Sequence, residues 1–109
     1  MTHDDRDNET WLLDATDEIV SAKAEIGFAA MTSIQRVTYC LWVADYGMRN
    51  AGDLTTAIDL FASFMRDGHV AAKEAGLPHS AHMFSLSIAD LEARYLGLFD
   101  GVINEIRAV

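Results

Sequence analysis

Five carboxylates near the start of the chain have the spacing of one helix face. On a helix that turns by about 100° per residue, four of them fall within about 20° of one line, namely Asp7, Asp14, Glu18 and Glu25, and Asp17 adds a fifth charge. Neighbours along this line would be roughly 6 to 11 Å apart, because a helix rises about 1.5 Å per residue. Phosphates along a DNA strand have spacings of similar order, so the row could present a phosphate-like field to a basic protein. The alternative interpretation is a solvated helix face that aids solubility.

A second polar group interrupts the most apolar part of the chain. Asp45 and Arg49 are four residues apart and can pair on one helix face. With their neighbours they would form a polar cluster at a corner between two helices, made of Trp42, Asp45, Tyr46, Arg49, Asn50 and Asp53. This cluster is either a structural network that caps the corner or the lining of a small-ligand pocket under the two aromatic rings. Lys23, on the preceding helix, is expected to expose its ammonium or to pair with Asp45.

Metal and nucleophile chemistry have little support in the sequence. His79 and His82 could reach one divalent metal from a single helical turn, but a structural site normally needs four ligands. They are weak candidates only, and we expect no metal and no cofactor. The sequence holds no G-x-S-x-G motif, no phosphate-binding glycine loop and no paired cysteine and histidine, so it does not indicate an enzyme. Cys40, the one cysteine, is expected to be a small buried apolar residue.

The elements that must position these residues are helices, because apolar residues recur every three or four positions and strand-like alternation does not persist. We predict a first helix over residues 8–26, begun by Asp7 or Asn8. A second helix covers about residues 33–49 and is apolar nearly all round. That pattern is typical of a helix at the centre of a bundle or at a subunit contact. We expect Asn50-Ala51-Gly52 to end it, because Asn and Gly tolerate the left-handed conformation.

The rest of the chain predicts two further main helices. Thr32 and Gln35 have the spacing of a capping box for the second helix. We expect Asp53 to cap a third helix that is broken near Gly68, and Ser87 to cap a last helix that runs to the C-terminus. The predicted fold is therefore all-α, a compact bundle of four main helices joined by short connections.

Length and charge limit the classes of function. A chain of 109 residues, half of them apolar, fits one helical domain over residues 8–109 behind a flexible acidic lead over residues 1–7. Seventeen acids against eight bases give a net charge of −9, which argues against direct nucleic-acid binding and against an anionic membrane. The acidic start lacks the basic and apolar parts of a secretory signal, and no apolar stretch is long enough to span a bilayer. We expect a cytoplasmic protein.

One stretch resembles a bacterial family of small acidic helical domains. The residues that carry the resemblance are Met31 to Tyr39, Leu41-Trp42 and Asn50-Ala51-Gly52, and the similarity extends to about Phe64. In that family an apolar helix with Trp or Tyr ends at an Asn-x-Gly turn. Most members have no assigned function, and one relative is a DNA mimic that binds a DNA-binding regulator. The resemblance implies an all-helical fold and a dimer.

Three functional hypotheses follow. The first is an interaction protein whose acidic row binds a basic partner, such as a DNA-binding protein, with an affinity that falls as salt rises. The second is a bundle that binds a small ligand or a metal through the polar corner or the two histidines. The third is a structural subunit of a homodimer, since the second and last helices offer apolar surface.

Overall fold

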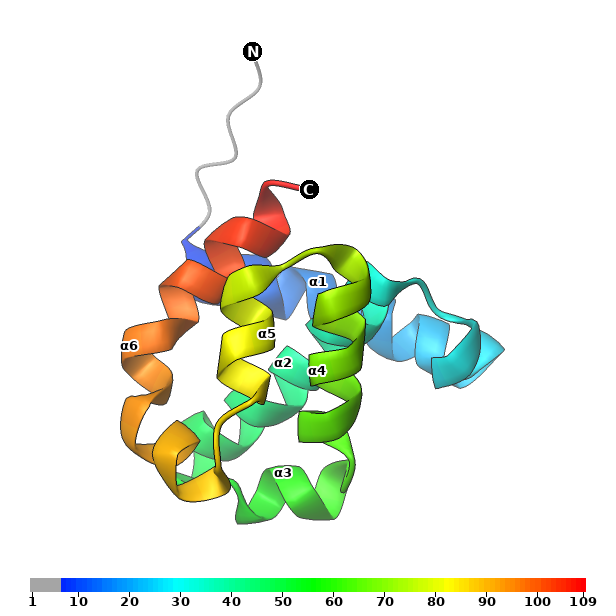
Figure 1. Cartoon of the computed structure of the whole chain (residues 1–109). Helices are drawn as coiled ribbons and strands as arrows, with labels where there is room; N and C mark the ends of the chain where they lie inside the picture. Colours follow the sequence, from blue (N-terminus) through cyan, green and yellow to red (C-terminus); the bar gives the residue numbers. More distant parts are fainter. Residues whose placement is uncertain (1–6) are drawn as a thin grey trace.

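The computed structural model describes residues 7–109, and every regular element in that range is helical (Figure 1). The elements are α1 (Asn8–Ile26), the short 3-10 turn η1 (Phe28–Ala30), α2 (Ser33–Ala51), α3 (Thr55–Leu60), α4 (Phe64–Ala75), α5 (Pro78–Phe84) and α6 (Ile88–Arg107). None of the described helices is long and apolar enough to cross a membrane. Of the predicted lead, only Asp7 is described.

Local capping explains where the longer helices begin and end. The Asp7 carboxylate accepts the backbone N–H of Thr10 at 2.7 Å and so begins α1. At the start of α2 the Thr32 hydroxyl accepts the Gln35 N–H at 3.1 Å, and the Gln35 side chain accepts the Thr32 N–H at 2.8 Å. Gly52, with a φ of 75°, ends α2 in the left-handed conformation. These three predictions are confirmed.

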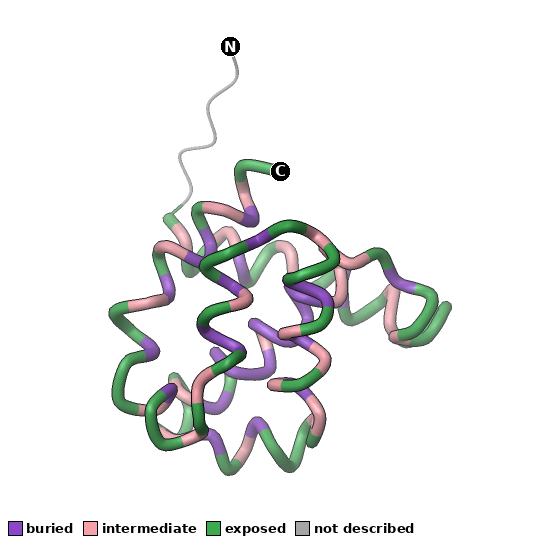
Figure 2. Tube along the Cα trace, in the orientation of Figure 1, coloured by how far each residue is buried: buried purple, intermediate pink, exposed green. Residues whose placement is uncertain are grey.

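The helix α2 is the centre of the fold. It packs against α1, α3 and α4, while α5 packs between α4 and α6. Figure 2 shows the buried positions gathered along α2 and on the inner sides of the helices around it. The last turns of α1 and the turn η1 extend beyond this body, toward the right in Figure 1. Both faces of α2 are therefore covered over most of its length, which explains its apolar composition.

The break in the predicted third helix is real, but its predicted position near Gly68 was wrong. The chain leaves the helix at residues 61–63, between α3 and α4, where the sequence has neither proline nor glycine. Phe61 at this junction packs against the rings of Phe28 and Tyr39, with centroids 5.1 and 5.4 Å away. Gly68 instead lies buried inside α4. With α3, α4 and α5 as separate short helices, the four-helix bundle is not confirmed in its detail.

Cys40 is completely buried in α2, and this burial raises the pKa of its thiol. A buried thiol reacts only when the structure opens, because the thiolate is the nucleophile. We expect native protein to react with a thiol-specific disulfide reagent at least ~10³-fold more slowly than a free cysteine. Spectrophotometric labelling with and without denaturant measures this ratio. Fast labelling of the native protein would contradict the burial of Cys40.

Candidate functional site

The outer face of α1 carries the predicted row of carboxylates. The described structure exposes all five of its members, Asp7, Asp14, Asp17, Glu18 and Glu25. On the opposite side of the same helix Leu12, Thr16 and Ile19 are buried. The 3.6-residue period therefore separates a buried stripe from a charged face, as the sequence indicates.

Three members of the row are not used by the fold. Among residues 7–109, Asp17, Glu18 and Glu25 make no hydrogen bond or ion pair. Asp7 has a structural role, and its hydrogen bond from the Thr10 N–H lowers the pKa of its carboxyl group. Exposed charges without a partner contribute little to stability, so most of the row is available to an external cation.

The first turn of α1 is fixed to the last turns of α6. The Asn8 amide donates to Asp100 Oδ1 at 2.8 Å and to Asn104 Oδ1 at 3.3 Å, while the Arg107 guanidinium donates to Asn8 Oδ1 at 2.9 Å. The guanidinium carbon of Arg107 also lies 5.8 Å from the centre of the Trp11 ring. These contacts hold α1 at a defined angle, so the charged face has a fixed shape.

The predicted polar corner contains a buried hydrogen-bond network. Asp45 Oδ1 accepts the hydroxyl of Tyr95 at 2.6 Å and the Nε–H of Arg49 at 2.8 Å. Arg49 also pairs with Glu9 at 2.9 Å, and its guanidinium lies 4.9 Å from the centre of the Phe99 ring. The network therefore joins α2 to both α1 and α6. The spacing in the sequence predicts the i, i+4 pair but not the part of Tyr95, because fifty positions separate it from Asp45.

Burial and charge in this network shift two pKa values. Partial burial opposes the charged form of Arg49, but the carboxylates of Asp45 and Glu9 outweigh it and raise the pKa of the guanidinium. Burial, and then the nearby Asp45 charge, raise the pKa of the Tyr95 hydroxyl. Tyr95 is therefore a neutral hydrogen-bond donor, and Arg49 is a permanent cation.

The remaining polar residues of the corner also bond within the chain. The Asn50 amide donates to the Tyr46 carbonyl oxygen at 2.8 Å, and Asp53 Oδ1 accepts the Thr55 N–H at 3.0 Å. The Trp42 ring packs against Tyr46, with centroids 5.8 Å apart. These bonds support the interpretation of the cluster as a network that orients the corner. A ligand pocket at this place stays a prediction.

Lys23 lies against aromatic rings rather than against Asp45. Its Nζ is 5.3 Å from the centre of the Tyr39 ring and 5.7 Å from that of Phe61. An ammonium at this distance is attracted by the electron-rich face of the ring. The lysine thus helps to hold the end of α1 to the junction between α3 and α4.

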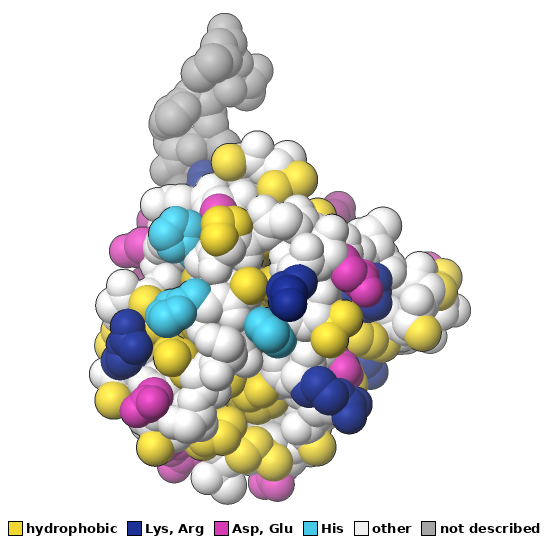
Figure 3. Space-filling view, viewed as in Figure 1, with side chains coloured by type: hydrophobic (Ala, Val, Ile, Leu, Met, Phe, Trp, Pro, Cys, Tyr) yellow, Lys and Arg dark blue, Asp and Glu magenta, His cyan; other side chains and the backbone are white. Residues whose placement is uncertain are grey.

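The two weak metal candidates lie on α5, the short helix after the turn at Gly76. No group of three or more potential ligands gathers anywhere in the described range. The backbone N–H groups of His79 and Ser80 donate to the Glu105 carboxylate at 2.9 and 3.0 Å. Figure 3 shows histidine side chains on the face formed by α4 and α5. The structure thus gives the start of α5 a cap from α6 and offers the histidines no further ligands.

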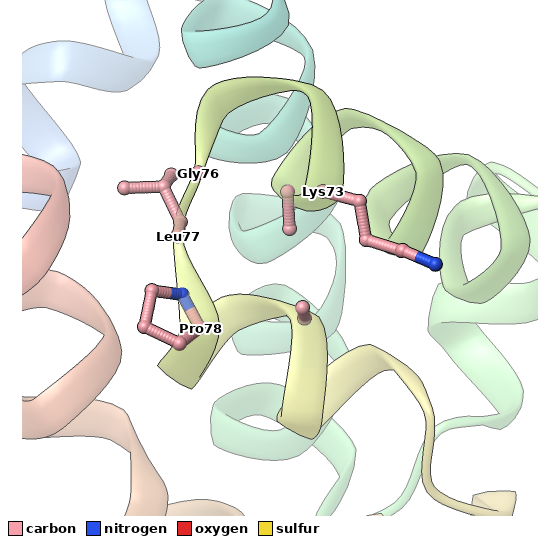
Figure 4. Close-up of a pocket in the computed structure, with 6 residues that line it drawn as sticks. Lys73, Gly76, Leu77 and Pro78 are labelled. Carbon is pink, nitrogen blue, oxygen red and sulfur yellow. The ribbon is translucent and has the colours of Figure 1, made fainter.

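The surface has hollows at two places, between α4 and α5 and along α1. One hollow lies between α4 and α5 and is lined mainly by small or apolar residues, with Lys73 at its edge (Figure 4). Two others lie along α1 and share Trp11, Ala15 and Glu18, so they form one continuous depression. We call it the α1 groove. The α1 groove contains two residues of the predicted acidic row, Asp14 and Glu18, whereas the hollow between α4 and α5 contains none.

Comparison of the chain with protein-family models, with curated proteins and with solved structures gave no match. We therefore infer the function of this chain mainly from the arrangement of its own residues.

Proposed function

We propose that this protein is a non-catalytic interaction module that binds a basic protein through the outer face of α1. The observation that carries the proposal is the row of exposed carboxylates, of which Asp17, Glu18 and Glu25 have no partner within residues 7–109. An exposed acidic face attracts cationic surfaces and speeds their encounter. A chain with a net charge of −9 adds a long-range field of the same sign.

The arrangement of the site supports binding rather than chemistry. The buried polar groups of the corner, Asp45 and Tyr95, bond to each other and leave no exposed pair of acid and base there. The carboxylates of the row are exposed on the surface of α1. Their use is therefore electrostatic, and binding should weaken as ionic strength rises.

We further propose that the basic partner is a DNA-binding protein. Along α1, Asp14 and Glu18 are separated by about 6 Å of rise, and Glu18 and Glu25 by about 10 Å. These intervals are of the order found between phosphates of one DNA strand, and the resemblance of residues 31–64 to a family with a DNA mimic points the same way. Duplex DNA should then compete with this protein for the partner. A partner that holds both at once would contradict the mimicry while leaving the acidic interaction intact.

Reversing two charges of the row tests the function. We expect Asp14→Lys with Glu18→Lys to weaken capture of basic proteins by about tenfold or more, because each attraction becomes a repulsion. Immobilised wild-type and variant protein, washed at increasing salt, give the measurement, and circular dichroism checks the fold.

The matched control is Asp59→Lys with Asp90→Lys, which makes the same change of net charge at exposed positions on α3 and α6. This control should retain its partners, since it leaves α1 unchanged. Equal losses in both variants would show that net charge acts without the α1 face, and unchanged capture by the first variant would remove the proposed function.

A further inference from the structure

The α1 groove has an apolar floor and an acidic rim. One part of it is a hollow of about 360 Å³ between α1, the first turns of α2 and the end of α6. Three isoleucines line it, Ile19, Ile34 and Ile106, of which the first and last are buried side chains of the core. The other part lies along α1 and adds Asp14, while Trp11 and Glu18 line both parts. The groove therefore offers apolar contact and negative charge side by side.

Two polar side chains of the floor bond within the chain. The Thr38 hydroxyl donates to the Ile34 carbonyl oxygen at 2.7 Å, and the Gln35 side chain belongs to the capping box of α2. An apolar side chain fits the three isoleucines best, because covering them removes apolar surface from water.

The wall of the groove already binds a cation of the chain itself. The Arg107 guanidinium lies 5.8 Å from the centre of the half-buried Trp11 ring. Trp11 thus accepts a guanidinium on its surface in the folded protein, and Glu18 lies two helical turns further along α1. Because Arg107 already lines the groove beside Trp11, an arginine or lysine side chain from outside would pair with the Glu18 carboxylate, away from the Arg107 charge.

From this juxtaposition we propose that the α1 groove is the anchor site for the basic partner, and that it binds a segment in which an apolar side chain neighbours an arginine or lysine. The inference rests on the proposed function and makes it specific. The apolar side chain covers Ile19, Ile34 and Ile106, while the cation lies beside Glu18. Electrostatic attraction then brings the partner to α1, and contacts in the groove determine which segment of the partner binds.

Two peptides of identical composition test the selection. Both consist of leucine and lysine, but only the first places leucine at i, i+3, i+4 and i+7, so that one face of a helix is apolar. We expect the first peptide to bind at least about fivefold more tightly, since truncation of a central apolar anchor commonly has an effect of this size. Titration by NMR with labelled isoleucine methyl groups should show shifts at the three groove isoleucines. The exposed Ile58 on α3 serves as the internal control.

Two variants separate the contribution of the α1 groove to peptide binding from that of the acidic charge. Trp11→Ala should remove the preference between the two peptides, whereas Leu96→Ala, a change at an exposed apolar residue of α6, should keep it. Because Trp11 is half-buried, the methyl shifts of the wild-type protein provide a second test that needs no variant. Equal affinity for both peptides, or shifts centred on Ile58, would overturn the anchor site and leave the acidic interaction standing. Failure of both peptides to bind would overturn the proposed function as well.

Discussion

Replacing Asp45 by alanine is expected to lower the free energy of unfolding by about 2–4 kcal/mol. The substitution leaves the completely buried hydroxyl of Tyr95 without its acceptor and removes the nearest counter-charge of Arg49. Arg49 is about one-third exposed and keeps Glu9, so water and that second carboxylate reduce the loss on its side. Urea unfolding followed by circular dichroism measures the change.

Removing the Tyr95 hydroxyl should lower the free energy of unfolding by less than removing the Asp45 carboxylate. Tyr95→Phe leaves Asp45 bonded to Arg49, and we expect a loss of about 1–2 kcal/mol. The double variant should lose less than the sum of the two single variants, because they remove the same hydrogen bond. Tyr46→Phe is the matched control, since Tyr46 is 42% exposed and its hydroxyl makes no hydrogen bond within the described range. Additive losses, or an effect of Tyr46→Phe as large as that of Tyr95→Phe, would contradict a buried network.

The same network sets how α1 presents its charged face. Arg49 reaches from α2 to Glu9 on α1, and Asn8 ties the same turn of α1 to α6. The acidic row is therefore carried by a helix that is fixed at its first turn by side chains from two neighbours. A rigid charged face loses little conformational entropy when it binds, so this arrangement favours recognition.

Features that depend on near neighbours in the chain could be predicted from the sequence. The capping box of Thr32 and Gln35 spans three residues, and the buried side of α1 follows from its own period. In each case the residues that decide the structure lie within one or two turns of each other, so local stereochemistry is enough. The all-helical fold class was accessible for the same reason.

Features that depend on distant partners were missed. The residues directly before α3 and α5, Leu54 and Leu77, have no capping side chain, and carboxylates of α6 accept N–H groups at both starts. At α3 the predicted contribution of Asp53 is also present, as a bond from the Thr55 N–H. Glu92 accepts the Leu54 N–H at 2.8 Å, and Glu105 accepts the first N–H groups of α5. In the sequence these glutamates look like ordinary surface charges. The α1 groove was missed in the same way, because its floor is assembled from Ile19, Ile34 and Ile106 on three separate helices.

Gly68 shows why helix propensity alone can misplace a helix break, and its substitution is expected to change stability strongly. Glycine weakens a helix by about 1 kcal/mol relative to alanine, which favours a break at this position. In the fold, however, the ring of Phe84 packs closely against Gly68. A Cβ atom added there would be 2.8 to 2.9 Å from three ring carbons. Glycine is needed at this position for close packing of α5 on α4, and the packing holds the helix intact through it.

We therefore expect Gly68→Ala to lower the free energy of unfolding by about 1–3 kcal/mol, against the direction of helix propensity. Phe84 is only 4% exposed, so its ring cannot move away into water. Gly97→Ala is the matched control, because a Cβ atom on that exposed face of α6 meets nothing within 4 Å. It should raise stability by about 0.5–1 kcal/mol. Thermal and urea unfolding of both variants measure the two changes in the free energy of unfolding. Because both glycines are helical, changes of opposite sign can arise only from the residues packed around them. Stabilisation by both changes would mean that α5 does not pack on α4 at Gly68.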